Sequence, residues 1–368
     1  MDLILRTAGA LLGTELSDPV DLGGSRRSSV LRCRTAAGGT VVVKAFGREP
    51  EALRSFASEA AALSLGAGPA LLGVDPDTPL LVMEDLGAAP TLADVLLGDD
   101  PKAATDGLLA WAGALGRLAA GSVTGHADFT RLAARFDQGV PSGPDDPWIE
   151  RCTAGLPALL AQSGVDVPPD LADELARIGA AARDRCPAFT PGDTCPDNNL
   201  LTADGLRLID FESATFQSVF LTAAYCRMPF STCWCVFRLP ADLARKVEQT
   251  YRAEVAAVYP ELAEDPVWQA GLRAAIALWT VHGTVYLLPH AGEDRPMHRS
   301  RRPVPTVRQL LRHRWETART LTEFPALART MELLLDGLAR DWQTAPLPEY
   351  PAFRNRGPRE PGEGGGAP

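Results

Sequence analysis

Residues 191 to 212 read PGDTCPDNNLLTADGLRLIDFE, and this stretch decides the fold that the sequence predicts. An Asp-Gly pair at 204–205 lies between two short apolar runs. Asp-Gly supplies the positive φ angles that a tight hairpin needs, so we expect two short antiparallel strands here. The return of the chain through this hairpin brings Asn198 and Asp210 to the same end.

A third oxygen-bearing side chain, Asp193, precedes Asn198 by five positions. Alone, that spacing is a weak signal, because turns attract Asp and Asn for conformational reasons. The hairpin and Asp210 behind it strengthen the signal. One carboxylate would face a carboxylate and amide pair able to hold Mg²⁺ through oxygen. Such an arrangement is suited to phosphoryl transfer from a nucleotide.

The bulk properties exclude several classes of protein. A chain of 368 residues with 46% apolar residues predicts two lobes or domains with a substantial core. A net charge of −10 argues against a nucleic-acid partner. The sequence contains no run of about 18 apolar residues, so we expect no membrane span. Its N-terminus does not resemble a signal peptide. Seven unevenly spread cysteines fit reduced thiols, so we expect a cytoplasmic protein.

Hydrophobic periodicity divides the chain near residue 87. Before it, we expect a short helix within 1–20, strands within 21–46 and at 80–83, and one main helix at 50–65. This order predicts a small antiparallel sheet with one helix. Beyond it the pattern is mostly helical, with a Pro- and Gly-rich tail that we expect to be disordered. The predicted helices are 105–121 and 171–185, with three or more further helices in the segments 241–258, 266–288 and 305–341. The predicted domains are 1–87, 88–343 and the tail 344–368.

Lys44 is a candidate phosphate ligand. Only three of the 36 basic residues are lysines, and Lys44 follows the apolar run 41–43. A lysine at a strand end is most often solvated, but a compact ammonium suits nucleotide phosphates. On the 50–65 helix, Glu59 lies about 60° from Phe56, at ~100° per residue, on the flank of the buried face. Glu59 is therefore the expected anionic partner of Lys44.

Two further segments are candidates for nucleotide contacts. Gly23, Gly24 and Ser25 form either an ordinary turn or a loop whose backbone amides face phosphates. The segment from Met83 through Glu84 to Leu86 connects the two lobes, as a plain strand-to-helix connection or as backbone that pairs with adenine.

In this order and spacing, these motifs resemble the aminoglycoside phosphotransferase and choline kinase-like family, over residues 20–215. The resemblance implies an α+β, protein-kinase-like bilobal fold, with a small antiparallel-sheet N-terminal lobe and a larger, mostly helical C-terminal lobe. It implies that Asp193 orients or deprotonates the acceptor hydroxyl. It also implies that Asn198 and Asp210 bind Mg²⁺. It implies that Lys44, held by Glu59, binds the α/β-phosphates of ATP, and that residues 84–86 form the hinge around adenine.

Two departures from the family pattern are visible. The family has His-Gly-Asp in the catalytic loop, where this chain has Pro191-Gly192-Asp193. The missing imidazole puts the geometry of the loop in doubt before it puts the chemistry in doubt. The region after Asp210 does not match a known acceptor site, so the acceptor cannot be carried over from the family.

The remaining polar clusters favour structural roles. Cys226, Cys233 and Cys235, with Cys195 nearby, lack the paired C-x-x-C units of a zinc site, and we interpret them as core thiols. His282 and His290 flank an apolar helix and are interpreted as structural or pocket-lining. The basic stretch 299–312 is either a solvated face or an anion-binding rim.

The sequence thus predicts an ATP- and Mg²⁺-dependent kinase that phosphorylates a hydroxyl of a small molecule. One alternative is a kinase for Ser or Thr of a peptide in natural-product biosynthesis. The other is a nucleotide-binding pseudokinase, which Pro191 motivates. No nucleic-acid or membrane partner is expected.

Overall fold

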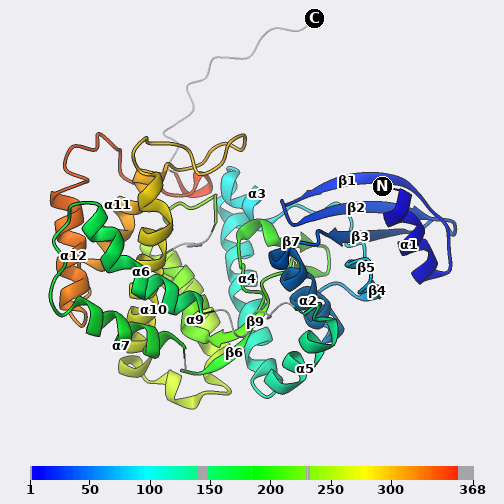
Figure 1. Ribbon diagram of the computed structural model, residues 1–368, viewed down its shortest axis with the longest axis horizontal. Helices are drawn as coiled ribbons and strands as arrows, with labels where there is room; N and C mark the ends of the chain where they lie inside the picture. The colour runs from blue at the N-terminus through cyan, green and yellow to red at the C-terminus, as the bar shows by residue number, and fades with distance from the viewer. Residues whose placement is uncertain (1, 140–146, 184, 229, 231–232, 355–368) are drawn as a thin grey trace, which may run out of the picture.

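The computed structural model describes residues 2–139, 147–183, 185–228, 230 and 233–354. The chain forms two lobes, a sheet-containing N-terminal lobe and a helical C-terminal lobe (Figure 1). The five-stranded antiparallel sheet has the order β1-β2-β3-β5-β4. Its elements are α1 (Asp2–Leu12), β1 (Leu16–Gly24), β2 (Ser28–Thr35), β3 (Thr40–Phe46), α2 (Pro50–Ser64), β4 (Leu71–Asp75) and β5 (Leu80–Glu84).

The C-terminal lobe contains two small antiparallel sheets among its helices. Strand β6 (Pro187–Thr190) pairs with β9 (Thr215–Ser218), and β7 (Asn199–Thr202) pairs with β8 (Gly205–Leu208). Its helices are α3 (Leu92–Leu97), α4 (Pro101–Ser122), α5 (His126–Phe136), α6 (Trp148–Gln162), α7 (Leu171–Arg183), α8 (Val219–Ala223), α9 (Ala241–Ala256), α10 (Asp265–Leu287), α11 (Val307–Ala318) and α12 (Pro325–Asp336). Among these described elements, no helix is both long and apolar enough to cross a bilayer.

Strand β3 is apolar on both faces because a helix covers each face of the sheet. Val41 and Val43 pack in a cluster with α1, whereas Phe46 packs in a second cluster with α2. Successive side chains of a strand alternate between faces, so Lys44 projects toward the α2 face. This alternation places the one charged residue of β3 under α2, in the interior of the molecule.

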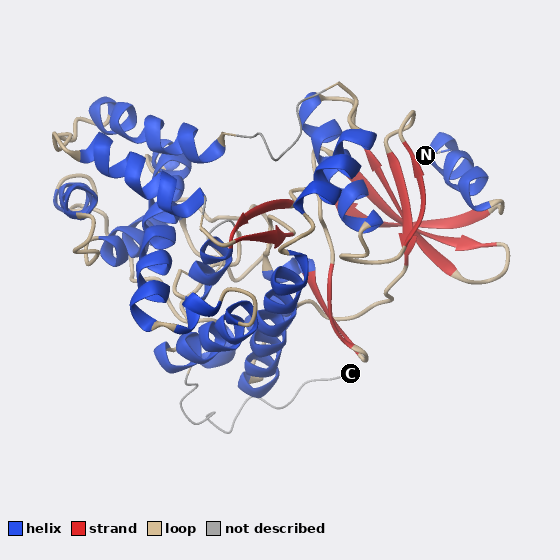
Figure 2. Ribbon diagram, turned by 90° about the horizontal axis from the view of Figure 1, so that it is seen from below, coloured by secondary structure: helices blue, strands red, loops and turns tan. Residues whose placement is uncertain are grey.

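The second apolar cluster joins the two lobes. Phe56 of α2 packs with Phe136 of α5 and with Phe211, which follows β8. Helix α5 lies beside α2 (Figure 1), and Figure 2 shows the sheet-containing lobe and the helical lobe from below. The proposed lobe boundary at residue 87 falls in the connection between β5 and α3. Because Leu208 of β8 and Phe211 belong to the same apolar cluster as Phe56, the β7–β8 hairpin packs toward α2, the helix that carries Glu59.

The structure confirms the predicted hairpin and the kinase-like order of elements, with some differences. Strand β4 and helices α5 and α6 were not predicted. Strand β4 contains Gly73 and α6 contains Pro157, and both residue types weaken a prediction from the sequence. Part of the predicted tail is ordered, because Leu347 and Tyr350 are buried within the C-terminal core despite their Pro-rich surroundings. The remainder of that prediction, 355–368, lies outside the described residues.

Two buried histidines of the C-terminal lobe predict a loss of stability in acid. Burial, reinforced by the charge of Arg314, lowers the pKa of His282 to about 3 and that of His313 to about 4. The unfolded chain therefore binds more protons than the folded protein below pH ~6.5. Their contribution to the free energy of unfolding is retained above pH ~6.5 and falls as the pH drops toward 4. From pH 7 to pH 5 we expect a loss of about 2 kcal/mol per histidine.

Urea unfolding at pH 7 and pH 5 measures this loss. The His282→Asn/His313→Asn variant should lose about 4 kcal/mol less than the wild type across that interval. An equal pH dependence in the two proteins would contradict the assignment.

Candidate active site

Lys44 lies in a buried ion-pair network at the junction of the lobes. Its Nζ atom lies 2.6 Å from Glu59 Oε2, 2.6 Å from Asp210 Oδ1 and 3.5 Å from Glu212 Oε2. Lys44 is 5% exposed and Glu59 is 2% exposed. The ion pair expected between these two side chains is therefore present, and α2 supplies the carboxylate.

The charged groups of this network shift the pKa values of Lys44 and Glu59. Burial alone would lower the pKa of Lys44, but the carboxylates of Glu59, Asp210 and Glu212 raise it. Burial raises the pKa of Glu59 to about 7, against the opposing effect of Lys44. Lys44 therefore stays cationic, and three carboxylates share one ammonium. Glu212 also pairs with Arg27, and the carboxylate oxygens that line an adjacent cavity, those of Asp210 among them, are ligands of the kind that a divalent cation prefers.

Asp210 faces Lys44 because of an unusual backbone conformation. Its φ angle is +64°, in the left-handed region that non-glycine residues rarely adopt. The turn that follows β8 directs Phe211 into the apolar core, where it stacks on Phe189 with ring centroids 6.3 Å apart. Strained backbone of this kind is often found at functional sites. Here it directs two consecutive side chains apart, with the Phe211 ring in the core and the Asp210 carboxylate at Lys44.

A cavity of about 980 Å³ lies between the sheet and the β7–β8 hairpin. Val30 and Val42 line it from the sheet, and Leu200 and Ile209 line it from the hairpin. Two apolar walls of this kind suit a flat aromatic ring. The predicted residues that also line this cavity are Gly24, Ser25, Lys44, Glu59, Met83, Glu84, Leu86, Asn198 and Asp210. Gly23 is the predicted nucleotide-binding residue that is absent from its lining.

The glycine loop folds tightly over this cavity. Gly24 has a φ of +141°, and a Cβ there would lie 2.3 Å from the backbone oxygen of Ser28. The Ser25 amide donates to the same oxygen at 3.0 Å. Position 24 therefore requires glycine, and the tight turn brings backbone to the cavity wall.

The side chain of Glu84 is already engaged at the connection between the lobes. Its carboxylate accepts from the Ala70 amide at 3.2 Å and pairs with Arg207 at 3.1 Å. These hydrogen bonds, that from Ala70 above all, lower the pKa of Glu84. Any contact of this segment with a ligand base would therefore come from its backbone, as the sequence suggested.

Asp193 and Asn198 are held in one compact loop. Asp193 Oδ1 accepts from the Cys195 amide at 3.1 Å, and Asn198 Nδ2 donates to the Asp193 carbonyl at 3.3 Å. Gly192 has a φ of +81°, and a Cβ there would lie 2.0 Å from the Ser213 carbonyl oxygen. The loop therefore passes directly against the segment that follows Asp210. This contact fixes Asp193 relative to Glu59, Asp210 and Glu212, which we call the acidic cluster. It does so without the histidine of the family pattern.

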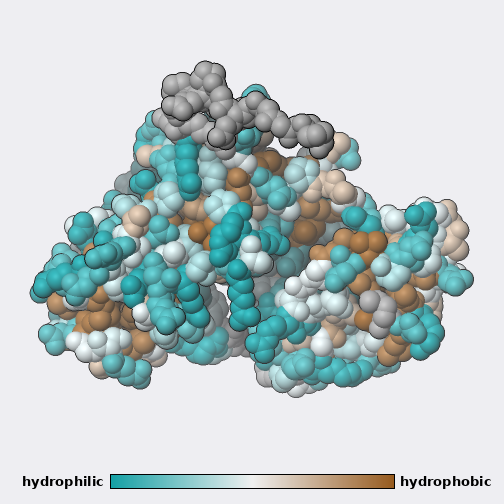
Figure 3. Space-filling view, turned by 90° about the horizontal axis from the view of Figure 1, so that it is seen from above, coloured by the Kyte–Doolittle hydropathy of each residue, from teal (hydrophilic) through white to brown (hydrophobic). Residues whose placement is uncertain are grey.

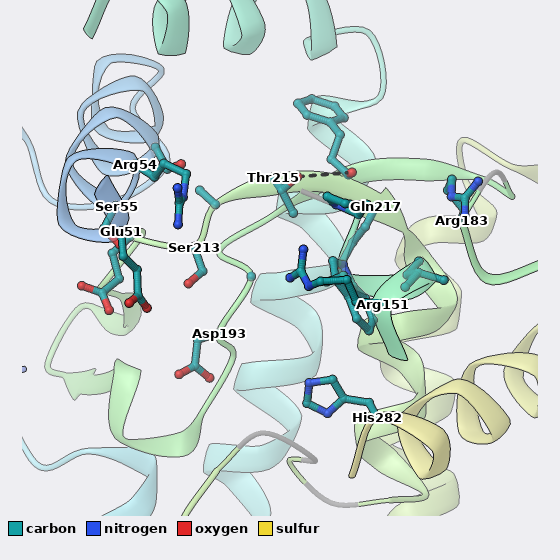
Figure 4. A pocket seen from close by; sticks show the side chains of 18 of the residues that line it. Glu51, Arg54, Ser55, Arg151, Arg183, Asp193, Ser213, Thr215, Gln217 and His282 are labelled. Atoms are coloured by element: carbon teal, nitrogen blue, oxygen red, sulfur yellow. Dashed lines mark hydrogen bonds between the residues drawn. The ribbon is translucent and has the colours of Figure 1, made fainter. Parts of the chain in front are cut away.

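Asp193 lines a second cavity, of about 750 Å³, on the other side of the acidic cluster. Figure 4 shows Asp193 directed into this space, with Arg151 and His282 approaching from the helices opposite. Arg54 borders the same space from α2. Glu212 lines both cavities. The two cavities therefore lie on either side of Glu212, one of the carboxylates that surround Lys44.

The outer surface reflects this arrangement. In the space-filling view a notch separates the lobes, and many of the residues along it are hydrophilic (Figure 3). Arg301 and Arg302 line the first cavity, whereas Arg308 and Arg312 donate to backbone carbonyls of the C-terminal lobe. The basic stretch thus divides into two arginines at the cavity and others that are structural.

No protein-family model and no curated protein matches this sequence. Solved structures do match across most of the chain. The Plasmodium vivax ethanolamine kinase is 11% identical, with 84% of each chain covered and a TM-score of 0.50. The GDP and kanamycin complex of APH(2")-IIia is 15% identical, with 93% of this chain and 99% of that chain covered and a TM-score of 0.50. A choline/ethanolamine kinase family protein from Mesorhizobium loti is 18% identical, with 87% and 93% covered and a TM-score of 0.49.

This chain has their kinase-like fold. The expected resemblance to choline kinases and aminoglycoside phosphotransferases is confirmed at the level of the fold. At these low identities, the matches do not indicate which substrate this chain uses.

Within this kinase-like fold, sequence reasoning missed two residues at the junction of the cavities. Glu212 ends the quoted stretch 191–212 and was assigned no role there, yet its carboxylate lies beside Lys44 and pairs with Arg27. Arg27 also pairs with Glu51 of α2 at 2.7 Å. Arg27 therefore ties the glycine loop to α2 and to the acidic cluster. Its position two residues after Ser25 was the available signal, but the abundance of arginine in this chain obscured it.

The cysteines also differ from expectation. Cys195 in the catalytic loop forms a disulfide with Cys233, whereas the sequence predicted reduced thiols. The other described cysteines form no disulfide and are buried.

Proposed function

We propose that this protein is an ATP- and Mg²⁺-dependent phosphotransferase that moves the γ-phosphoryl group to a hydroxyl of a small molecule. The observation that carries the proposal is the pair of cavities that share Glu212 as a lining residue. Lys44 and Asp210 line one cavity, and Asp193 lines the other. A donor and an acceptor bound in the two cavities would thus meet between these groups.

The residues present fit the nucleotide and the metal. Oxygen ligands are what Mg²⁺ prefers, and one carboxylate oxygen each from Glu59, Asp210 and Glu212 lies within 4.8 Å of the others. We propose that Asp210 and Asn198 hold the metal and that Lys44 binds the α/β-phosphates. When bound, Mg²⁺ would neutralise the charge that develops on the phosphates. Gly23, Gly24 and Ser25 would cover the phosphates, and the backbone from Met83 to Leu86 would pair with adenine.

Asp193 would act on the acceptor. Its carboxylate would accept a hydrogen bond from the substrate hydroxyl and orient that oxygen toward the γ-phosphorus. The new oxygen–phosphorus bond forms as the bond to the β-phosphate oxygen breaks, so that ADP leaves. The hydroxyl proton passes to Asp193 and then to solvent. The remaining contribution is positioning and electrostatics, with no covalent enzyme intermediate.

The size of the second cavity favours a small-molecule acceptor over a peptide. At about 750 Å³ it lies within the range that small ligands occupy. The relatives of known structure include an ethanolamine kinase and a kanamycin complex, which supports the same class without naming the acceptor.

Transfer of label from γ-labelled ATP to a fractionated metabolite extract tests the proposal. We expect one or a few fractions to yield a labelled product that requires Mg²⁺ and the protein. Parallel reactions with labelled GTP establish which nucleotide is used. Binding of nucleotide without a labelled product from any fraction would favour the pseudokinase alternative.

A further inference from the structure

Three cysteines and an aspartate converge on the back of the catalytic loop. The Cys233 and Cys235 Sγ atoms lie 3.1 Å apart, and Cys233 is bonded to Cys195. The sulfurs of Cys195 and Cys233 and a carboxylate oxygen of Asp197 all lie within 4.8 Å of one another. The three cysteines are at most 5% exposed. The chain therefore brings two sulfurs and the half-buried carboxylate of Asp197 together, with the sulfur of Cys235 beside that of Cys233.

This convergence exceeds what a core thiol or a single disulfide requires. A disulfide between Cys195 and Cys233 accounts for two of the sulfurs and leaves that of Cys235 beside them. Cys226, only seven residues before Cys233, is a buried thiol, and among the described residues no sulfur contact of this kind is recorded for it. Three thiolates with one carboxylate or imidazole are, by contrast, a donor set of the kind that holds zinc tetrahedrally.

We propose that the reduced cluster is a structural zinc site, with Cys195, Cys233, Cys235 and Asp197 as its four ligands. The assignment does not depend on the proposed function. A dithiol reductant would open the disulfide by giving up two electrons and two protons and leaving as its own disulfide. Zinc would then displace the thiol protons. A Zn–S distance of about 2.3 Å sets neighbouring sulfurs about 3.8 Å apart, so the side chains, that of Cys235 above all, would have to rotate once the disulfide is open.

The surroundings of Asp197 suit a metal ligand. Its Oδ2 atom accepts from Trp234 Nε1 at 2.8 Å and lies 3.6 Å from Arg301. Arg301 in turn lies over the Trp234 ring, 4.7 Å from its centroid. Ligating carboxylates are commonly oriented by such outer hydrogen bonds. The sequence contains no pair of C-x-x-C units. The proposed ligands are spaced differently, as Cys195-x-Asp197 on the loop and Cys233-x-Cys235 on the second segment.

The site would anchor the loop that carries Asp193 and Asn198. The Cys195 amide bonds to Asp193, and the Asn198 amide donates to the Cys195 carbonyl at 3.0 Å. A metal on Cys195 and Asp197 would therefore hold both residues from behind. That role would compensate for Pro191, which stands where the family pattern has a histidine that scaffolds this loop.

Metal analysis of the full chain tests the assignment without any nucleotide. The protein is produced with added zinc, purified with a dithiol, and dialysed against metal-free buffer before zinc, iron, nickel and copper are measured. We expect about one zinc ion per chain in the wild type and in the control Cys226→Ser. Cys195→Ser, Cys233→Ser and Cys235→Ser should lose it, and Asp197→Asn should release it to a competing chelator that the wild type resists.

Cys235→Ser is the decisive variant, because a Cys195–Cys233 disulfide does not use Cys235. Zinc retained by Cys235→Ser would overturn the proposal, as would a wild type without zinc or with iron in its place. If the serine variants fail to fold, cobalt added to the reduced, metal-free wild type provides the second measurement. Thiolate-to-cobalt charge-transfer absorption is expected, and its absence would contradict the site.

Discussion

Replacing Asp193 with asparagine is expected to lower phosphate transfer by about 10²- to 10⁴-fold while leaving ATP affinity nearly unchanged. The amide keeps the size of the side chain, and its oxygen can still accept the hydrogen bond from the Cys195 amide. What it loses is the charge that orients the acceptor hydroxyl and takes its proton. Asp193 lines the second cavity and not the first, so the nucleotide should not sense the change directly.

The measurement pairs transfer of labelled phosphate with an ATP titration of the same preparation. Asp204→Asn is a matched control, since Asn-Gly forms the same hairpin turn as Asp-Gly and lies away from both cavities. The control should retain wild-type activity. Turnover retained by Asp193→Asn would remove Asp193 from the proposed role.

The second large effect is expected at Lys44. In Lys44→Met the buried carboxylate of Glu59 and the partly exposed carboxylate of Asp210 lose their shared cation. Breaking a buried ion pair by removing one partner costs about 3–5 kcal/mol, so the free energy of unfolding should fall by roughly that amount. ATP binding should be lost as well, because the phosphates lose their ammonium.

A double variant separates the two effects. Lys44→Met/Glu59→Gln removes the buried unpaired charge and should recover much of the stability, but it should not recover ATP binding. Lys102→Met is the control, because its exposed pair with Asp106 on α4 is solvated. Denaturant unfolding and calorimetric titration provide the two measurements. ATP binding that survives in Lys44→Met would contradict the assignment of the phosphate site.

Local signals predicted the central part of the site. The hairpin around Asp204-Gly205 was predictable because turn chemistry is local, and its closure fixed Asn198 and Asp210 at one end. The Lys44–Glu59 pair was predictable because helix and strand periodicities each define a face. Both features depend on fewer than 20 consecutive residues.

Features formed by distant segments could not be predicted in this way. Arg27 meets Glu212 across 185 positions, and no periodicity in the sequence relates them. The cysteine cluster depends on how the segment at 233–235 returns to the catalytic loop, 38 residues beyond Cys195. The second cavity is assembled from α2, α6, α7 and α10, and its shape follows from packing alone.

Calorimetric titration of ATP into the wild-type protein, with and without Mg²⁺, tests the central claim most directly. The account predicts one site per chain that requires Mg²⁺, with an affinity at least about tenfold (~1.4 kcal/mol) weaker in Asp210→Asn. A wild type that binds no nucleotide would contradict it. So would an ATP affinity that is the same with and without Mg²⁺ and in Asp210→Asn.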